Sequence, residues 1–210
     1  MKKFLHNTDE ILLQRSDLKV IHEMIPEGAR ILDLGCGSGT FLQALKNQKN
    51  ARVTGVEIHQ QILAQCVERG VPVIQANLDT DLADFSDDTY DFVILSRTLQ
   101  AVRRPDLLLQ EMLRVGKCGI VSFMNFGHIN SRFPLTFTGK MPVNKNLPRP
   151  WYHTQTIHPG TIKDLRNLFR ELNIRVVKEI PVSNPGDFCP FLRNLWPNLF
   201  CSTCVFVIEK

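Results

Sequence analysis

Short apolar runs alternate with amphipathic helical patterns along most of this chain, and that alternation limits the folds open to it. Most of the runs are continuously apolar, as in strands that are covered on both faces of a sheet. The seven candidate strands are residues 29–35, 51–58, 71–77, 90–96, 118–124, 175–182 and 202–209. This order predicts an α/β fold with a doubly wound, mostly parallel sheet and helices on both faces. Prolines between the last two strands predict an antiparallel return at the sheet edge rather than a crossover helix.

The ends of several helices can be placed from single residues. An N-terminal helix should end before Pro26, because proline cannot continue a helix. Asp106 follows Pro105 and suits the N-cap of a helix that runs to about residue 115. Thr161 should cap a later helix, with Asp164 placed favourably in its first turn.

The bulk properties fit one globular domain over residues 1–210. The net charge of +4 is mild and the Lys and Arg residues are scattered, so we expect no nucleic-acid partner. No secretion signal and no long apolar span are visible, which predicts a cytoplasmic protein without a membrane partner. The six cysteines therefore suggest reduced thiols. Cys201 and Cys204 have a CxxC spacing, but no second pair matches it, so no metal site is expected.

Residues 125–160 form an insertion that does not fit the alternation. Four prolines precede Trp151, and the apolar residues follow no clean period. Loops this long inside compact domains are usually functional or disordered, and the aromatic and histidine content argues against disorder. The candidate general bases or substrate-binding groups in this segment are His128, Tyr152, His153 and His158. A histidine in a polar loop is, however, more often a surface or hydrogen-bonded residue than a base. Trp151 and Tyr152 could stack on a substrate or anchor a partner protein.

A glycine-rich turn follows the first predicted strand, in the stretch ILDLGCGSGT. Asp33 precedes Gly35, Gly37 and Gly39, and ligands of open α/β sheets bind at the carboxyl ends of the strands. Glu57 ends the next strand, 24 positions after Asp33 (57 − 33), where an acid can accept both hydroxyls of a ribose. The glycine turn and Glu57 together predict a site that binds a nucleoside. A tight turn without a ligand, and a solvated strand end for Glu57, are the alternatives.

The spacing of the glycines indicates which nucleoside-containing cofactor the turn would bind. A dinucleotide-binding fingerprint would need a glycine where Thr40 stands. An acid two positions before G-x-G-x-G instead resembles the S-adenosylmethionine motif of class I methyltransferases. That resemblance implies a Rossmann-like, seven-stranded sheet with an antiparallel last strand. It also implies S-adenosylmethionine or S-adenosylhomocysteine as the cofactor.

The resemblance to class I methyltransferases assigns roles to residues of this chain. Asp33 would hold the methionyl ammonium through water, and Glu57 would take the ribose hydroxyls. Asn77, where many members have Asp, would flank the adenine with Leu78 and accept a hydrogen bond without charge assistance. Leu95 and Ser96 would form the wall below the adenine. The whole candidate cofactor site is Asp33, Gly35, Cys36, Gly37, Gly39, Glu57, Ile58, Asn77, Leu78, Asp79 and Ser96.

Longer stretches are similar to one family within that superfamily. VIQANLDTDLADFSDDTYDFVILSRTLQAV, EMLRVGKCGIVSFMNFGH and GKMPVNKNLPRPWYHTQTIH resemble the MetW family of methionine biosynthesis proteins. The likeness covers nearly the whole chain and includes the insertion, although Arg97 stands where Gln would be expected. It implies a role in bacterial methionine synthesis beside homoserine O-acyltransferase, a MetX-like partner whose full activity needs MetW.

Two functions stay open at this point, because both need the same cofactor pocket. In the first, the chain is an accessory subunit that binds the acyltransferase and brings S-adenosylmethionine to it as a regulatory ligand. The contact surface would be the insertion or residues 185–197, whose apolar side chains could equally pack beneath the last strand. In the second, the chain is a true small-molecule methyltransferase with the insertion as a lid. No catalytic residue is assigned, and Ser96-Arg97-Thr98-Leu99 lacks the Asn-Pro-Pro-Tyr signature of many amino-directed enzymes.

Overall fold

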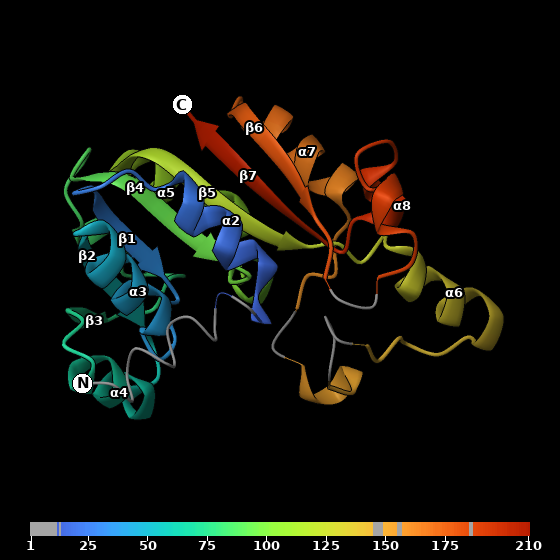
Figure 1. Cartoon of the computed structure of the whole chain (residues 1–210), viewed down its shortest axis with the longest axis horizontal. Coiled ribbons are helices and arrows are strands. Elements are labelled where there is room, and N and C mark those ends of the chain that lie inside the picture. The colour runs from blue at the N-terminus through green and yellow to red at the C-terminus, as the bar shows by residue number, and fades with distance from the viewer. Residues whose placement is uncertain (1–11, 13, 145–148, 155–156, 185–186) are drawn as a thin grey trace.

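A computed structural model describes residues 12, 14–144, 149–154, 157–184 and 187–210 of the chain. Within these residues seven strands form one sheet in the order β3-β2-β1-β4-β5-β7-β6 (Figure 1). The strands are β1 (Arg30–Leu34), β2 (Arg52–Glu57), β3 (Val73–Gln75), β4 (Tyr90–Ser96), β5 (Gly116–Met124), β6 (Arg175–Val182) and β7 (Thr203–Glu209).

The direction of the strands confirms the predicted fold class. β3, β2, β1, β4 and β5 run parallel, whereas β7 lies antiparallel between β5 and β6. β1 pairs with both β2 and β4, so the strand order reverses beside β1. In open α/β sheets that reversal opens a crevice at the carboxyl ends of the strands, where ligands bind.

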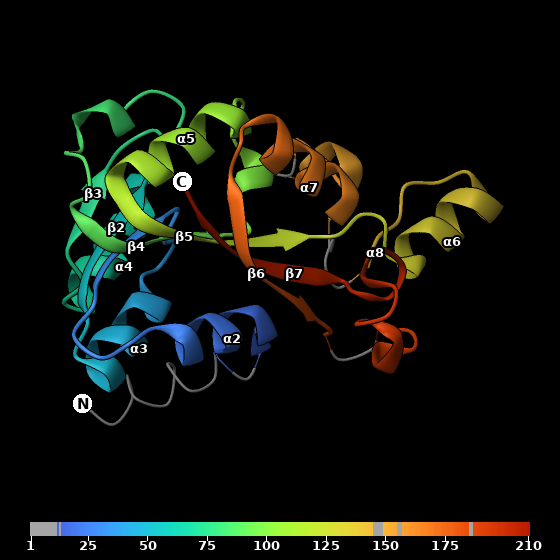
Figure 2. The same cartoon turned by 90° about the horizontal axis from the view of Figure 1, so that it is seen from above.

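Helices cover both faces of the sheet (Figure 2). One face carries α2 (Ser16–Met24) and α3 (Thr40–Lys49), and the other carries α5 (Pro105–Val115) and α7 (Ile162–Glu171). A further helix, α4 (Gln60–Glu68), places Cys66 in the same apolar cluster as α2 and α3. Because the sheet is covered on both sides, its central strands are apolar throughout instead of alternating.

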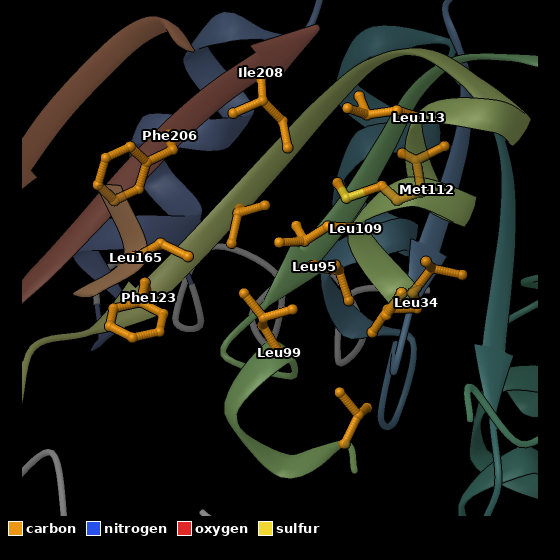
Figure 3. Close-up of a cluster of buried hydrophobic side chains, with 14 of the residues drawn as sticks. Leu34, Leu95, Leu99, Leu109, Met112, Leu113, Phe123, Leu165, Phe206 and Ile208 are labelled. Carbon is orange, nitrogen blue, oxygen red and sulfur yellow. The ribbon is translucent and has the colours of Figure 1, made fainter. Parts of the chain in front are cut away.

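The core on the α5 face is closely packed. Leu34 of β1 and Leu95 of β4 lie beneath Leu109 and Met112 of α5, and all four are fully buried (Figure 3). Apolar burial of this kind is worth about 1.5–3 kcal/mol for each large side chain. It holds the strand ends, and so the loops that follow them, in a fixed arrangement.

The structure confirms two of the helix ends predicted from the sequence and corrects a third. α2 ends before Pro26, as predicted, and Thr161 and Asp164 form a reciprocal capping box at the start of α7. The N-cap predicted at Asp106 is wrong, because α5 begins at Pro105 with Arg104 as its N-cap. Proline suits the first helical position and forces the residue before it out of the helix.

The insertion contains regular structure that its aperiodic sequence did not predict. It includes α6 (Ile129–Thr138) and a short 3-10 turn η3 (Trp151–His153), while residues 145–148 and 155–156 lie outside the described part. His128 caps the start of α6, since its Nδ1 accepts a hydrogen bond from the backbone N–H of Asn130 at 3.1 Å. In both views α6 projects from one end of the molecule, away from the sheet (Figures 1 and 2).

Four short segments complete the described elements. They are η1 (Leu82–Asp84), η2 (Leu99–Ala101), η4 (Pro190–Leu192) and α8 (Pro197–Phe200). None of the helices in the described residues has the length and apolar content that crossing a membrane requires.

Candidate functional site

A cavity of about 610 Å³ lies at the carboxyl ends of β1, β2 and β4. That volume is in the range of pockets that hold small organic ligands. Eight residues of the predicted cofactor site line it: Gly35, Gly37, Glu57, Ile58, Asn77, Leu78, Asp79 and Ser96. Four separate loops therefore bring the predicted residues to one place.

The glycine turn after β1 has a backbone that side chains would disturb. Gly35, Gly37 and Gly39 have φ angles of 82°, 54° and 74°, in the left-handed region. A Cβ on Gly35 would lie 2.7 Å from the Thr98 side chain, and one on Gly39 would lie 3.0 Å from Cys66 Sγ. A Cβ on Gly37 would meet no atom within 4 Å, so the chain itself leaves space beside this residue. Gly37 is thus the point where a ligand can approach the backbone most closely.

Glu57 ties this turn to the end of β2. Its Oε2 accepts a hydrogen bond from Gly37 N at 3.1 Å, and its Oε1 accepts from Ile58 N at 2.9 Å and His59 N at 3.0 Å. Glu57 is 8% exposed, so the alternative of a solvated strand end is wrong. A carboxylate has about four acceptor positions, which leaves capacity toward the cavity.

Asp33 is buried beneath the glycine turn, and one of its carboxyl oxygens lacks a hydrogen-bond partner in the described part of the chain. It is 3% exposed, and its Oδ1 has no hydrogen-bond partner among the described residues. Burial raises the pKa of Asp33 to about 7; the positive charge of Arg15 opposes this rise and the charge of Glu57 adds to it. A buried acceptor left unpaired typically costs about 1–3 kcal/mol, so this carboxyl is suited to a donor supplied by a ligand.

A buried ionic network lies next to the cavity, and no local sequence pattern predicted it. Asp17 of α2 is fully buried and accepts hydrogen bonds from Arg15 at 2.6 Å, Arg97 at 3.3 Å and Ser122 Oγ at 2.6 Å. Burial alone would raise the pKa of Asp17, but these partners hold it at about 2. Arg15 also donates to Ser96 Oγ at 2.6 Å, which connects the network to the cavity wall.

The loop after β3 is a structured turn. Asn77 Oδ1 accepts a hydrogen bond from Asp79 N at 3.0 Å, and Asn77 N donates to Asp81 Oδ2 at 2.7 Å. Asp79 Oδ1 accepts from Arg103 N at 2.8 Å, which joins this loop to the start of α5. The Asn77 amide oxygen therefore already carries one hydrogen bond, and only its second acceptor position is available.

Three predicted residues lie behind the cavity rather than on its wall. Asp33 is buried under the turn, Gly39 is the N-cap of α3, and Cys36 packs against Gly55. Burial raises the pKa of the Cys36 thiol, so it stays protonated. Leu95, expected below the adenine, is also fully buried, whereas Ser96 lines the wall.

The side chains proposed as bases in the insertion do not line this cavity. His128 is 2% exposed, and burial lowers its pKa although the charge of Asp187 opposes this. Tyr152, His153 and His158 are exposed at other places on the surface. In this arrangement they do not contribute to the site.

Sequence reasoning missed several residues of the cavity wall. The cavity is also lined by Val56, His59, Ile62, Ala76, Arg97, Thr98, Ala101 and Val102. Four of them, His59, Ala76, Arg97 and Thr98, lie within two positions after the end of a strand. The rule that ligands bind at that edge could have found them.

The cysteines at the other end of the sheet pack in the interior. Cys201 and Cys204 are fully buried, and their thiols donate to the carbonyl oxygens of Thr203 at 2.7 Å and Ile180 at 3.5 Å. In the described part of the chain, no three potential ligand side chains gather in an arrangement that could hold a metal ion.

Comparison with known proteins identifies the same family in two ways. A family model described as methionine biosynthesis protein MetW matches residues 15–208. The chain is 38% identical over 173 residues to a bifunctional methionine biosynthesis protein MetXA/MetW of Rhodopirellula baltica. This match covers 78% of the chain but only 28% of that relative's length.

Several more distant relatives are methyltransferases. A phosphatidylethanolamine N-methyltransferase of Cereibacter sphaeroides is 26% identical over 174 residues, which is 79% of each chain. The crystal structure of an S-adenosylmethionine-dependent methyltransferase from Mesorhizobium loti superimposes with a TM-score of 0.69 at 17% identity. It covers 95% of this chain and 100% of that one, which supports the Rossmann-like methyltransferase fold.

Proposed function

The chain belongs to the MetW family of methionine biosynthesis proteins, and from that premise we propose that it binds S-adenosylmethionine and supports homoserine acylation by a separate acyltransferase. The cofactor, or its demethylated product, would occupy the cavity at the carboxyl ends of β1, β2 and β4. The observation that carries this proposal is the unpaired Oδ1 of Asp33 beneath an open glycine turn.

The donors and acceptors of the cavity fit this cofactor. Asp33 lies behind the cavity wall, so it would hold the methionyl ammonium through water, which would supply the missing donor, and the nearby positive charge would favour the ionised carboxyl. The backbone at Gly37 would lie against the methionyl part, where no side chain interferes. Glu57 already accepts three backbone hydrogen bonds, so its remaining acceptor position would take one ribose hydroxyl. S-adenosylmethionine carries an activated methyl group, but an accessory role requires only that it binds.

The partner is proposed from the bifunctional relative, whose name joins MetXA and MetW in one chain. Fusion keeps two proteins at a high effective concentration, which benefits proteins that act together. A homoserine O-acyltransferase is therefore the partner we propose for this separate chain. The ligand would regulate it only if its affinity differs between the free and the partner-bound states.

The alternative function is that of a true small-molecule methyltransferase. The similarity to a phosphatidylethanolamine N-methyltransferase supports this alternative. Two observations favour the accessory role. Ser96, on the cavity wall, is bonded to Arg15, and Arg97 is held by Asp17, so both groups already have partners. Among the described residues of the insertion, none lines the cavity as a lid over an acceptor would.

The test is the rate of homoserine acylation by the purified cognate acyltransferase. It is measured with and without this chain, and with S-adenosylmethionine absent or saturating. We expect a higher rate with the chain and a further change with the cofactor, and the Glu57→Ala variant should remove only the cofactor-dependent part. An unchanged rate under all conditions would refute the accessory role, and transfer of a labelled methyl group to a metabolite would support the alternative function.

The proposal places both proteins in the cytoplasm, consistent with six free thiols, and cell fractionation would test this.

A further inference from the structure

The insertion carries a net positive charge because it has no acidic residues to balance its basic ones. Residues 125–160 contain four Lys or Arg residues and no Asp or Glu. The whole chain has 25 basic and 21 acidic residues, so the remainder carries no net charge. The entire excess of +4 therefore belongs to one segment.

The helix in this segment exposes an aromatic face. Ser131 is the only buried residue of α6, whereas Phe133 and Phe137 are 60% and 71% exposed. The two rings lie on the same side of the helix, four positions apart, with centroids separated by 4.4 Å. Ser131 precedes Phe133 by two positions, which places it on nearly the opposite side. The aromatic stripe thus points away from the body of the protein.

Such an arrangement is poorly stabilised by the chain alone. A helix of about ten residues is marginal in water unless a neighbour covers its apolar face. Pro134 lies inside α6 and removes one backbone hydrogen bond from it. Clustered exposed aromatic side chains with charged residues around them are typical of protein interfaces.

We propose that this surface, the α6 patch of Phe133, Phe137, Lys140 and Met141, is where the acyltransferase of the proposed function docks. Lys140 and Met141 follow the helix directly, and both are exposed. The complementary surface on the acyltransferase is apolar at its centre and acidic at its rim. This inference rests on the proposed function, since it names the surface by which that partner is bound.

Charge argues against a second copy of this chain as the occupant. In a symmetric dimer the same patch would meet itself, and its basic residues would face one another. The insertion offers no acidic residue to compensate them. An acidic protein surface has the opposite charge and gains from the encounter.

A second exposed apolar group provides the matched control. Phe191 of η4 and Trp196, four residues after η4, are 77% and 58% exposed, which overturns the idea that this segment packs beneath the last strand. Pro185, at its start, lies outside the described residues. This group follows β6 instead of belonging to the basic insertion, so its truncation removes as much aromatic surface without touching the α6 patch.

The experiment compares the double variant Phe133→Ala/Phe137→Ala with Phe191→Ala/Trp196→Ala. Binding to the purified acyltransferase is measured by calorimetry, and S-adenosylmethionine binding and thermal unfolding are measured on the same samples. We expect the α6 variant to lose at least about tenfold in affinity for the acyltransferase. Its melting temperature and its cofactor affinity should stay unchanged, because both residues are exposed and neither lines the cavity. Lys140→Glu should weaken binding most at low salt.

The outcomes separate this inference from the proposed function. If the wild-type chain neither binds nor stimulates the acyltransferase, the proposed function fails and the docking surface fails with it. If the wild type binds but the α6 variant binds equally well, the surface is wrong while the function stands. If the α6 variant loses binding only to vesicles of anionic phospholipid, the patch is a membrane contact and the inference is overturned.

Discussion

Replacing Asp33 by Asn tests the central feature of the site, a buried carboxyl that lacks a partner. Asn has nearly the same shape but carries no charge. We expect the variant to be more stable than the wild type in the absence of ligand at pH 8, and to bind S-adenosylmethionine at least about tenfold more weakly. Stability and binding should therefore change in opposite directions.

The magnitude follows from the pKa of Asp33, which burial raises from 3.8 to about 7. Folding disfavours the ionised form, so the destabilisation is absent below pH 3.8 and complete above about pH 7. Each pKa unit is worth about 1.4 kcal/mol, which gives roughly 4 kcal/mol at pH 8 and roughly 1.5 kcal/mol at pH 5. The Asn side chain brings its own unpaired groups, at about 1–3 kcal/mol. The net gain at pH 8 should then be about 1–3 kcal/mol.

Urea unfolding of both proteins at pH 5 and pH 8, without ligand, measures this directly. The advantage of the variant should be nearly 3 kcal/mol smaller at pH 5, by roughly the difference between the two charge penalties. A variant less stable than the wild type at pH 8 would refute the reasoning about an unpaired charge. An advantage independent of pH would show that Asp33 does not titrate near 7.

Three further substitutions probe other parts of the site and fold. Glu57→Ala removes the acceptor of three backbone N–H groups and should weaken S-adenosylmethionine binding by at least about 1.5 kcal/mol in calorimetry; unchanged affinity would contradict the proposed ribose contact. Asp17→Asn leaves Arg15 and Arg97 without their counter-charge and should lower the free energy of unfolding by about 3–5 kcal/mol at pH 7. Because partners hold the pKa of Asp17 at about 2, its contribution is present above about pH 4 and should disappear as the pH falls toward 2, which a urea series at several pH values would reveal. Thr161→Ala breaks the capping box of α7 and should cost about 1 kcal/mol of stability in urea unfolding, with no change in cofactor affinity.

Local patterns in the sequence were sufficient for the sheet and for the turn that follows β1. The predicted runs identified all seven strands. Most of the runs are continuously apolar because their strands are covered on both faces, whereas the first half of β6, at the sheet edge, is exposed. The glycines at 35, 37 and 39 were found because their left-handed backbone admits few other residues. Boundaries were less certain where neighbours decide them, as at the start of α5, where Pro105 and not Asp106 sets the first turn.

Features that depend on residues far apart in the chain became visible only in the tertiary structure. Asp17 meets Arg97 and Ser122, which lie 80 and 105 positions away, because the sheet order brings β4 and β5 under α2. The missing partner of Asp33 and the exposed faces of Phe133 and Phe137 are likewise properties of the assembled fold. Backbone geometry and apolar period are encoded locally, so the sequence by itself determined the class of fold and the position of the turn. Burial and charge pairing are set by which elements become neighbours, and these were decided by the tertiary structure alone.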